Sequence, residues 1–237
     1  TDSLKKYLDQ LDKQSVETGE LKWRLSLQYD LLERNLQLEN TLISGEIAGR
    51  YDDIVFDGVT VDSHINYFID KHEETTKQVD KQSVKIKNLF VGVPIQALQL
   101  DAQFNMAKPV IQHFKARLLG GRIDFDDFKI EAPSQTILNI AGISLAELIK
   151  YSAYPEIKSK AVIDAMLPLA LTKEGPVITD GMLFARPPGG YIKVPENTVI
   201  KAMGRGNPAF SFTMQLLSNF QFDTLQGKVD YTSDGES

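Results

Sequence analysis

Residues 161–193 constrain the fold more than any other part of the chain, because they read as long strands separated by Gly and Pro turns. The run starts as AVIDAMLPLAL, continues after a Gly-Pro break as VITDGMLFAR, and ends after PPGG as YIK. Alternate positions of its first segment are aliphatic, namely Ile163, Ala165, Leu167, Leu169 and Leu171. A period of two is typical of a strand with one apolar face. The sequence therefore indicates an extended apolar surface.

Residues 156–171 taken alone also fit a helix, because Val162, Ala165 and Leu169 would share one helical face. Pro168 disfavours a helix interior, and in a strand it indicates an edge or a bulge. A single strand over 157–171 would be roughly 50 Å long. We therefore expect a mainly β fold: a long, curved antiparallel sheet, polar on one face and apolar on the other, with a few short covering helices.

Strand alternation recurs elsewhere, most clearly over 21–29 and 98–106. A Gly-polar-aliphatic-polar-aromatic pattern begins at Gly19, Gly121 and Gly227. Their spacing is unequal, which excludes a fixed-period solenoid. The pattern fits either a meander whose strands start alike or any amphipathic strand that follows a turn.

Short helices are predicted at 3–13, 144–154 and 207–219. In the second, Ser144 has the position of an N-cap and Glu147 follows three residues later, which is the capping-box spacing. In the third, Asn207 precedes Pro208, a residue favoured at the first helical position.

Composition limits the partners. The chain has 237 residues, of which 42% are hydrophobic, so residues 1–237 can form one β-rich domain. Its net charge of −6 and its scattered Lys and Arg argue against a nucleic-acid partner. It has no cysteine and no apolar run of membrane-spanning length. A strand-like end, GKVDYTSDGES, suggests a fragment of a longer protein.

Catalytic and metal signatures are incomplete. His72-Glu73-Glu74 lacks the second histidine of a HExxH zinc motif. Asp124, Asp126 and Asp127 resemble the start of a calcium loop but lack its glycine and its final glutamate. No GxSxG elbow occurs, and no carboxylate pair stands out as a glycosidase pair. We predict a protein that is not an enzyme and has no cofactor or metal.

A family resemblance rests on turn and packing motifs. They are Leu118-Leu119-Gly120-Gly121, the strand-to-helix run 138–149, Leu167-Pro168-Leu169, Asp180-Gly181, and Pro188-Gly189-Gly190. Over residues 84–237 the chain resembles the C-terminal region of YdbH-like proteins, which belong to the AsmA-like group of bacterial envelope proteins. Residues 1–83 share only the general β pattern.

The resemblance implies a periplasmic protein, anchored to the inner membrane through a segment outside these residues. It implies that 156–171 is a strand and that long strands form a groove for phospholipid between the inner and outer membranes. It also suggests a small outer-membrane lipoprotein as a partner. The family region carries the label "dicarboxylate transport", but paired Arg or Lys for two carboxylates are missing from the long strands.

The leading hypothesis is therefore a lipid-carrying groove. Burial of an acyl chain of roughly 16 carbons would contribute on the order of 12 kcal/mol, at about 0.8 kcal/mol per methylene. The candidate lining residues are Leu100, Phe104, Phe125, Ile163, Leu167, Leu169, Leu171 and Leu183.

Alternative readings remain open. The same residues could form an ordinary core under the three predicted helices. The protein could also be a scaffold whose edge strands take up a partner chain, or a domain associated with dicarboxylate transport.

Overall fold

The computed structural model describes residues 14–32, 34–69, 82–105, 108–195 and 219–233. These residues form sixteen strands and one helix, α2. Most strands belong to a 13-stranded sheet with the order β1-β4-β5-β6-β7-β8-β9-β10-β12-β13-β16, to which β3 is added at β5 and β2 at β3. A separate 3-stranded sheet has the order β11-β14-β15. The predicted class, mainly β with a large antiparallel sheet, is confirmed.

The chain divides into two compact units. Unit 1 comprises residues 1–116 with 125–134, and unit 2 comprises 117–124 with 135–237. Strands β8 and β9 contribute residues to both. The strands from β1 to β9 are Gln14–Thr18, Leu21–Asp30, Asn35–Ser44, Ile47–Tyr51, Ile54–Ile69, Gln82–Phe90, Pro94–Asn105, Lys108–Leu118 and Gly121–Lys129. The later elements are β10 Ser134–Ser144, α2 Leu145–Lys150, β11 Lys158–Ser159, β12 Val162–Leu171, β13 Pro176–Ala185, β14 Gly190–Lys193, β15 Phe220–Phe222 and β16 Gln226–Tyr231.

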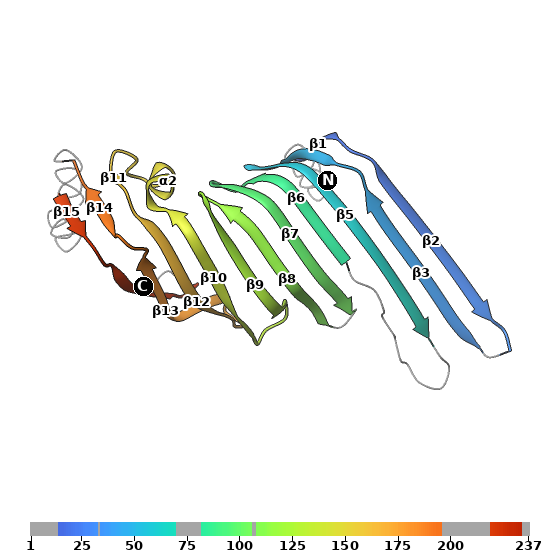
Figure 1. Cartoon of the computed structure of the whole chain (residues 1–237). Coiled ribbons are helices and arrows are strands. Elements are labelled where there is room, and N and C mark those ends of the chain that lie inside the picture. The colour runs from blue at the N-terminus through green and yellow to red at the C-terminus, as the bar shows by residue number, and fades with distance from the viewer. Residues whose placement is uncertain (1–13, 33, 70–81, 106–107, 196–218, 234–237) are drawn as a thin grey trace, which may run out of the picture. The chain divides into compact units, whose positions relative to one another are not determined.

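Strands β2, β3, β5, β6 and β7 of unit 1 run side by side (Figure 1). Hairpins join β2 to β3 and β6 to β7, and in both the register is continuous. Apolar and polar residues largely alternate in these strands with a period of two. Successive side chains point to opposite sides of a strand, so most apolar residues lie on one side of the sheet and most polar residues on the other.

The run over 161–193 forms strands, as predicted: β12, β13 and β14. The β12–β13 register shifts between Met166 and Leu169, so Pro168 lies at a bulge, one of the two positions that its chemistry indicates. The three recurring Gly motifs each start a strand, namely β2, β9 and β16.

The expected single strand over 157–171 is wrong in one respect, because the chain changes sheets within it. Residues Lys158–Ser159 form β11 in the small sheet, and β12 begins only at Val162 in the large one. Between them the Lys160 N–H donates to the Tyr191 carbonyl, and the Ala161 carbonyl accepts from the Leu145 N–H. The consecutive residues Lys160 and Ala161 therefore bond to two different segments. A single straight strand over 157–171 could not make both hydrogen bonds.

The helix predicted at 144–154 begins where expected and ends early. Ser144 is its N-cap, and its Oγ accepts a hydrogen bond from the Glu147 N–H at 3.3 Å. The Glu147 carboxylate does not complete the capping box; it pairs with Lys150, while the Ser144 N–H donates to Leu119. The helix has six residues. The helices predicted at 3–13 and 207–219 lie outside the described residues, apart from residue 219.

Candidate functional site

The most distinctive surface of unit 1 is one side of its sheet. Residues directly opposite each other in an antiparallel pair project to the same side. The register places Trp23 opposite Leu42 and Leu27 opposite Leu38, and then Leu38 opposite Tyr67. Further along, Val61 lies opposite Val84, and Val84 opposite Leu100. We call this side the apolar face of unit 1; it comprises Leu21, Trp23, Leu25, Leu27, Tyr29, Leu36, Leu38, Leu42, Val61, Ile65, Tyr67, Ile69, Val84, Ile86, Leu98, Leu100 and Ala102.

The opposite side of the same strands is mainly polar, although the exposed residues Ile43 and Phe68 also lie on it. On β2 it presents Lys22, Arg24, Ser26, Gln28 and Asp30, and on β3 it presents Gln37, Glu39 and Thr41. Most of these side chains are exposed. The sheet therefore has the two contrasting sides that an antiparallel sheet with one solvated face requires.

The apolar face is not covered as a core would be. On β2 its residues are more than half exposed, from 53% for Leu25 to 68% for Trp23. On β3 and β5 they are mostly half-buried, and Ala102 of β7 is buried. The described part of unit 1 consists of strands and contains no helix that could lie over this side. Large exposed apolar patches are typical of sites that contact proteins, membranes or ligands, so this face is a candidate binding surface.

Polar side chains also lie within or beside the apolar face, among them Asn40, Ser44 and Gln82. Asn40 accepts a hydrogen bond from the Trp23 indole N–H at 2.7 Å, which fixes that ring against β3. Ser44 accepts from the Val61 N–H at 2.7 Å. Gln82 is 4% exposed, and neither its Oε1 nor its Nε2 has a partner within the described residues. A buried amide without partners costs free energy, so Gln82 is the least satisfied group of this surface.

The predicted lining residues fall into both units. In unit 1, Leu100 lies on the apolar face. Phe104 belongs to β7, but its side chain is outside the described part of the structure. Phe125 stacks on Phe114 with ring centroids 4.7 Å apart and meets Phe128 edge-on at 5.8 Å.

The other predicted residues come together on β12 and β13 of unit 2. Leu167 is buried, and Ile163 packs against a small core of Ala161, Ala185 and Phe222. Leu171 and Leu183 are half-buried. Leu169 lines a cavity of about 590 Å³, together with Gln135, Thr136, Ile137, Pro168, Ala170 and Thr179.

Sequence reasoning did not select the β2 row, which is the most exposed row of the apolar face, or the half-buried β3 and β5 rows beside it. The sequence does contain a pattern for an apolar strand face there, since apolar and polar residues alternate from Leu21 to Tyr29. Alternation does not distinguish an uncovered face from a packed one, because both require an apolar residue at every second position.

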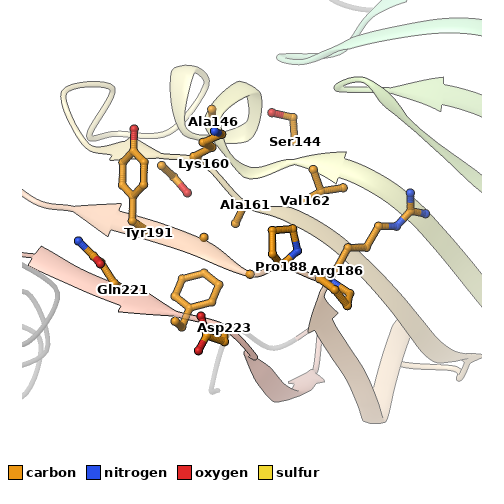
Figure 2. A pocket seen from close by; sticks show the side chains of 15 residues that line it. Ser144, Ala146, Lys160, Ala161, Val162, Arg186, Pro188, Tyr191, Gln221 and Asp223 are labelled. Atoms are coloured by element: carbon orange, nitrogen blue, oxygen red, sulfur yellow. The ribbon is translucent and has the colours of Figure 1, made fainter.

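A second cavity, of about 680 Å³, lies in unit 2 beside the small sheet (Figure 2). Buried Ala161 and Phe222 line it, as do the polar residues Ser159, Lys160, Tyr191, Gln221 and Asp223. Arg186 also lines it, but its Nε donates to Asp164 Oδ1 and Oδ2 at 2.9 and 2.8 Å. This hydrogen bond from Arg186 is the main reason that the pKa of Asp164 is lowered from its ordinary value.

The acidic and histidine residues of the sequence are dispersed or paired. Asp126 is 2.7 Å from His113 Nδ1, and Asp124 accepts from Asn139 Nδ2 at 3.4 Å. Within the described ranges, His, Asp and Glu form no group of three that could hold a metal ion. In the same ranges, no helix is long and apolar enough to cross a membrane.

Comparison with known proteins identifies the family of this chain. Residues 9–237 match the model of a family described as YdbH-like, intermembrane phospholipid transport protein YdbH. A search of curated proteins and a search of solved structures each found no match. The family match also includes most of the N-terminal region, where β2, β3 and β5 contribute to the apolar face. Since it spans nearly the whole chain, the protein belongs to the YdbH-like family, whose description is intermembrane phospholipid transport.

Proposed function

We propose that this protein carries phospholipid between the inner and outer membranes, with the acyl chains lying on the apolar face of unit 1. The observation that carries the proposal is the exposure of the β2 row, from Leu21 to Tyr29, in a unit whose described part has no covering helix. An acyl chain is an apolar ligand that needs area and no specific polar partner. Each methylene that leaves water there contributes about 0.8 kcal/mol.

In this proposal the acyl chain lies across the strands of unit 1, and the headgroup lies away from the apolar face. Leu100 would contribute to this lining, and Leu169 and Leu171 of unit 2 are candidates for a further apolar stretch. The protein would act in the periplasm, held to the inner membrane through a segment outside residues 1–237. The family's description as a phospholipid transport protein supports this assignment.

The test uses Trp23, because it is the only tryptophan of the chain and lies on the apolar face. Delipidated protein is titrated with phospholipid that carries a nitroxide either on an acyl chain or on the headgroup. We expect the acyl-chain nitroxide to quench Trp23 fluorescence more strongly than the headgroup nitroxide.

The matched control moves the indole to the other side of the same strand. In the variant Trp23→Phe with Ser26→Trp, the new indole lies on the polar side of β2. It should be quenched much less by the acyl-chain nitroxide. Equal quenching at both positions, or none at Trp23, would exclude acyl-chain binding on this face.

A second role, partner binding by strand addition, is favoured by one observation. Among the described strands, β16 pairs only with β13, so one of its edges has no strand neighbour there. Such an edge is a template for another chain, and a small outer-membrane lipoprotein is our candidate partner. Lys228 is next to Val229, whose carbonyl faces β13, so the Lys228 N–H faces the open edge. Lys228→Pro should abolish complex formation and leave Trp23 quenching intact; a complex that persists would exclude β16 as the docking edge.

A further inference from the structure

The cavity of about 680 Å³ in unit 2 has a mixed lining that the acyl-chain proposal does not use. Its volume is within the range of small-molecule pockets, about 300–1,000 Å³. Ala161 is 3% and Phe222 9% exposed, so its floor is apolar and well packed. Polar side chains surround this floor, an arrangement that suits a polar group joined to an apolar one.

Side chains of opposite charge line the cavity from segments that follow two different strands. Figure 2 shows Lys160, which follows β11, on one side of the cavity and Asp223, which follows β15, on the other. Within the described residues, no hydrogen bond or ion pair engages either side chain, and none joins the two. Arg186 differs, because Asp164 already occupies its guanidinium. Among the described residues, the cavity therefore offers one cation and one anion that have no protein partner, Lys160 and Asp223.

Ser159 adds an unused donor. Its residue is 9% exposed, it lines the cavity, and its Oγ has no hydrogen-bond partner in the part of the chain that the structure describes. A buried hydroxyl normally has a partner. Ser159 and Lys160 both line the cavity, so the Ser159 hydroxyl and the Lys160 ammonium are candidate donors to an anionic group there.

The wall that carries these groups is closely packed. A Cβ on Gly189 would be 2.0 Å from the Phe222 carbonyl oxygen, and one on Gly190 would be 2.2 Å from the Lys160 carbonyl oxygen. Only glycine permits both approaches. The chain at Gly189 and Gly190 therefore packs directly against β15 and against the backbone of Lys160. This part of the cavity wall is held in place by close backbone contacts.

We propose that this cavity binds a zwitterionic phospholipid headgroup, a phosphate beside a primary ammonium as in phosphoethanolamine. The phosphate oxygens would accept from Lys160 and Ser159, and the ammonium would donate to Asp223. Ala161 and Phe222 would contact the start of the apolar part. The inference rests on the proposed function for the source of the ligand, a phospholipid, and it adds a preference among headgroups.

The test uses soluble headgroups without acyl chains, so that the apolar face of unit 1 plays no part. Glycerophosphoethanolamine has both charges, and glycerophosphoglycerol has the phosphate alone. Calorimetric titration should show that the wild-type protein binds the first at least about tenfold more tightly, as expected when one charged hydrogen bond is added.

Variants assign the two charges. Lys160→Gln should weaken binding of both compounds, whereas Asp223→Asn should weaken only glycerophosphoethanolamine, each by at least about tenfold. Lys173→Gln and Glu174→Gln in the β12–β13 turn are matched controls outside the cavity lining and should change neither affinity. Equal affinity for the two compounds, or affinities that the cavity variants leave unchanged, would overturn the proposal.

Failure here is separable from failure of the proposed function. If acyl-chain nitroxides quench Trp23 but glycerophosphoethanolamine does not bind, the headgroup site is wrong and acyl-chain binding stands. If glycerophosphoethanolamine binds as described but Trp23 is not quenched, the cavity binds this headgroup chemistry and the apolar face does not carry lipid.

Discussion

Asp164 shows how one side chain connects three parts of unit 2. Its Oδ1 accepts from the Gly142 N–H of β10 at 2.6 Å, and both carboxylate oxygens accept from Arg186, which follows β13. All these bonds favour the ionised carboxylate, so the pKa of Asp164 is below its ordinary value of 3.8. Twenty-two residues separate Asp164 from each partner. No local sequence pattern predicts contacts over such distances.

The first prediction concerns this carboxylate. Asp164→Asn should lower the free energy of unfolding by about 1 kcal/mol near neutral pH, a modest value because Arg186 is half exposed. A carboxylate with a lowered folded-state pKa stabilises the fold above its unfolded-state pKa, and this contribution is lost as the pH falls through the folded-state pKa.

Urea denaturation of wild type and Asp164→Asn across pH checks this. The difference in stability should be constant from neutral pH down to about 5 and should shrink below the ordinary value of 3.8. A difference that grows as the medium becomes more acidic would contradict the assigned role.

At the scale of elements, period-two alternation predicted β2, β12 and β13, and the capping position predicted the start of α2. Two features were not predictable. The change of sheet at 160–161 depends on Tyr191 and Leu145, which are distant in sequence. At the early end of α2, the Tyr151 N–H donates to the Leu148 carbonyl, three residues earlier, so the last turn closes as a tighter turn and the helix stops.

Ser144 provides the second prediction. Ser144→Ala removes the acceptor for the Glu147 N–H and should lower the free energy of unfolding by about 1 kcal/mol. Chemical denaturation measures this, with Gln28→Ala at an exposed position on the polar side of β2 as a control that should change stability little. A loss no larger than that of the control would show that the cap contributes nothing.

The β2 row provides the third prediction. Leu25→Lys with Leu27→Lys should reduce phospholipid uptake at least about tenfold, because two apolar side chains leave the binding surface. The row is exposed in the structure, at 53% and 61% for these residues, so stability should change little. Ser26→Lys with Gln28→Lys places the same charges on the polar side of β2, and its uptake should equal that of wild type. Equal losses in both variants would indicate a general effect of charge.

At the scale of the whole molecule, alternating apolar residues over many segments were sufficient to predict a mainly β protein with a large antiparallel sheet. They could not predict which apolar positions remain uncovered. Leu167 and Leu25 have similar local patterns, yet Leu167 is 9% exposed and Leu25 53%. The difference arises from which elements pack nearby, and that depends on tertiary structure.

Site-specific photo-crosslinking on β3 tests the central claim most directly. A photoreactive phenylalanine derivative replaces Leu38, which lies on the apolar face, or its neighbour Gln37, which lies on the polar side. The protein is irradiated in living cells and its adducts are identified by mass spectrometry. We predict phospholipid adducts through the acyl chain at position 38 and none at position 37. Equal adducts at both positions, or no lipid at position 38, would contradict the account.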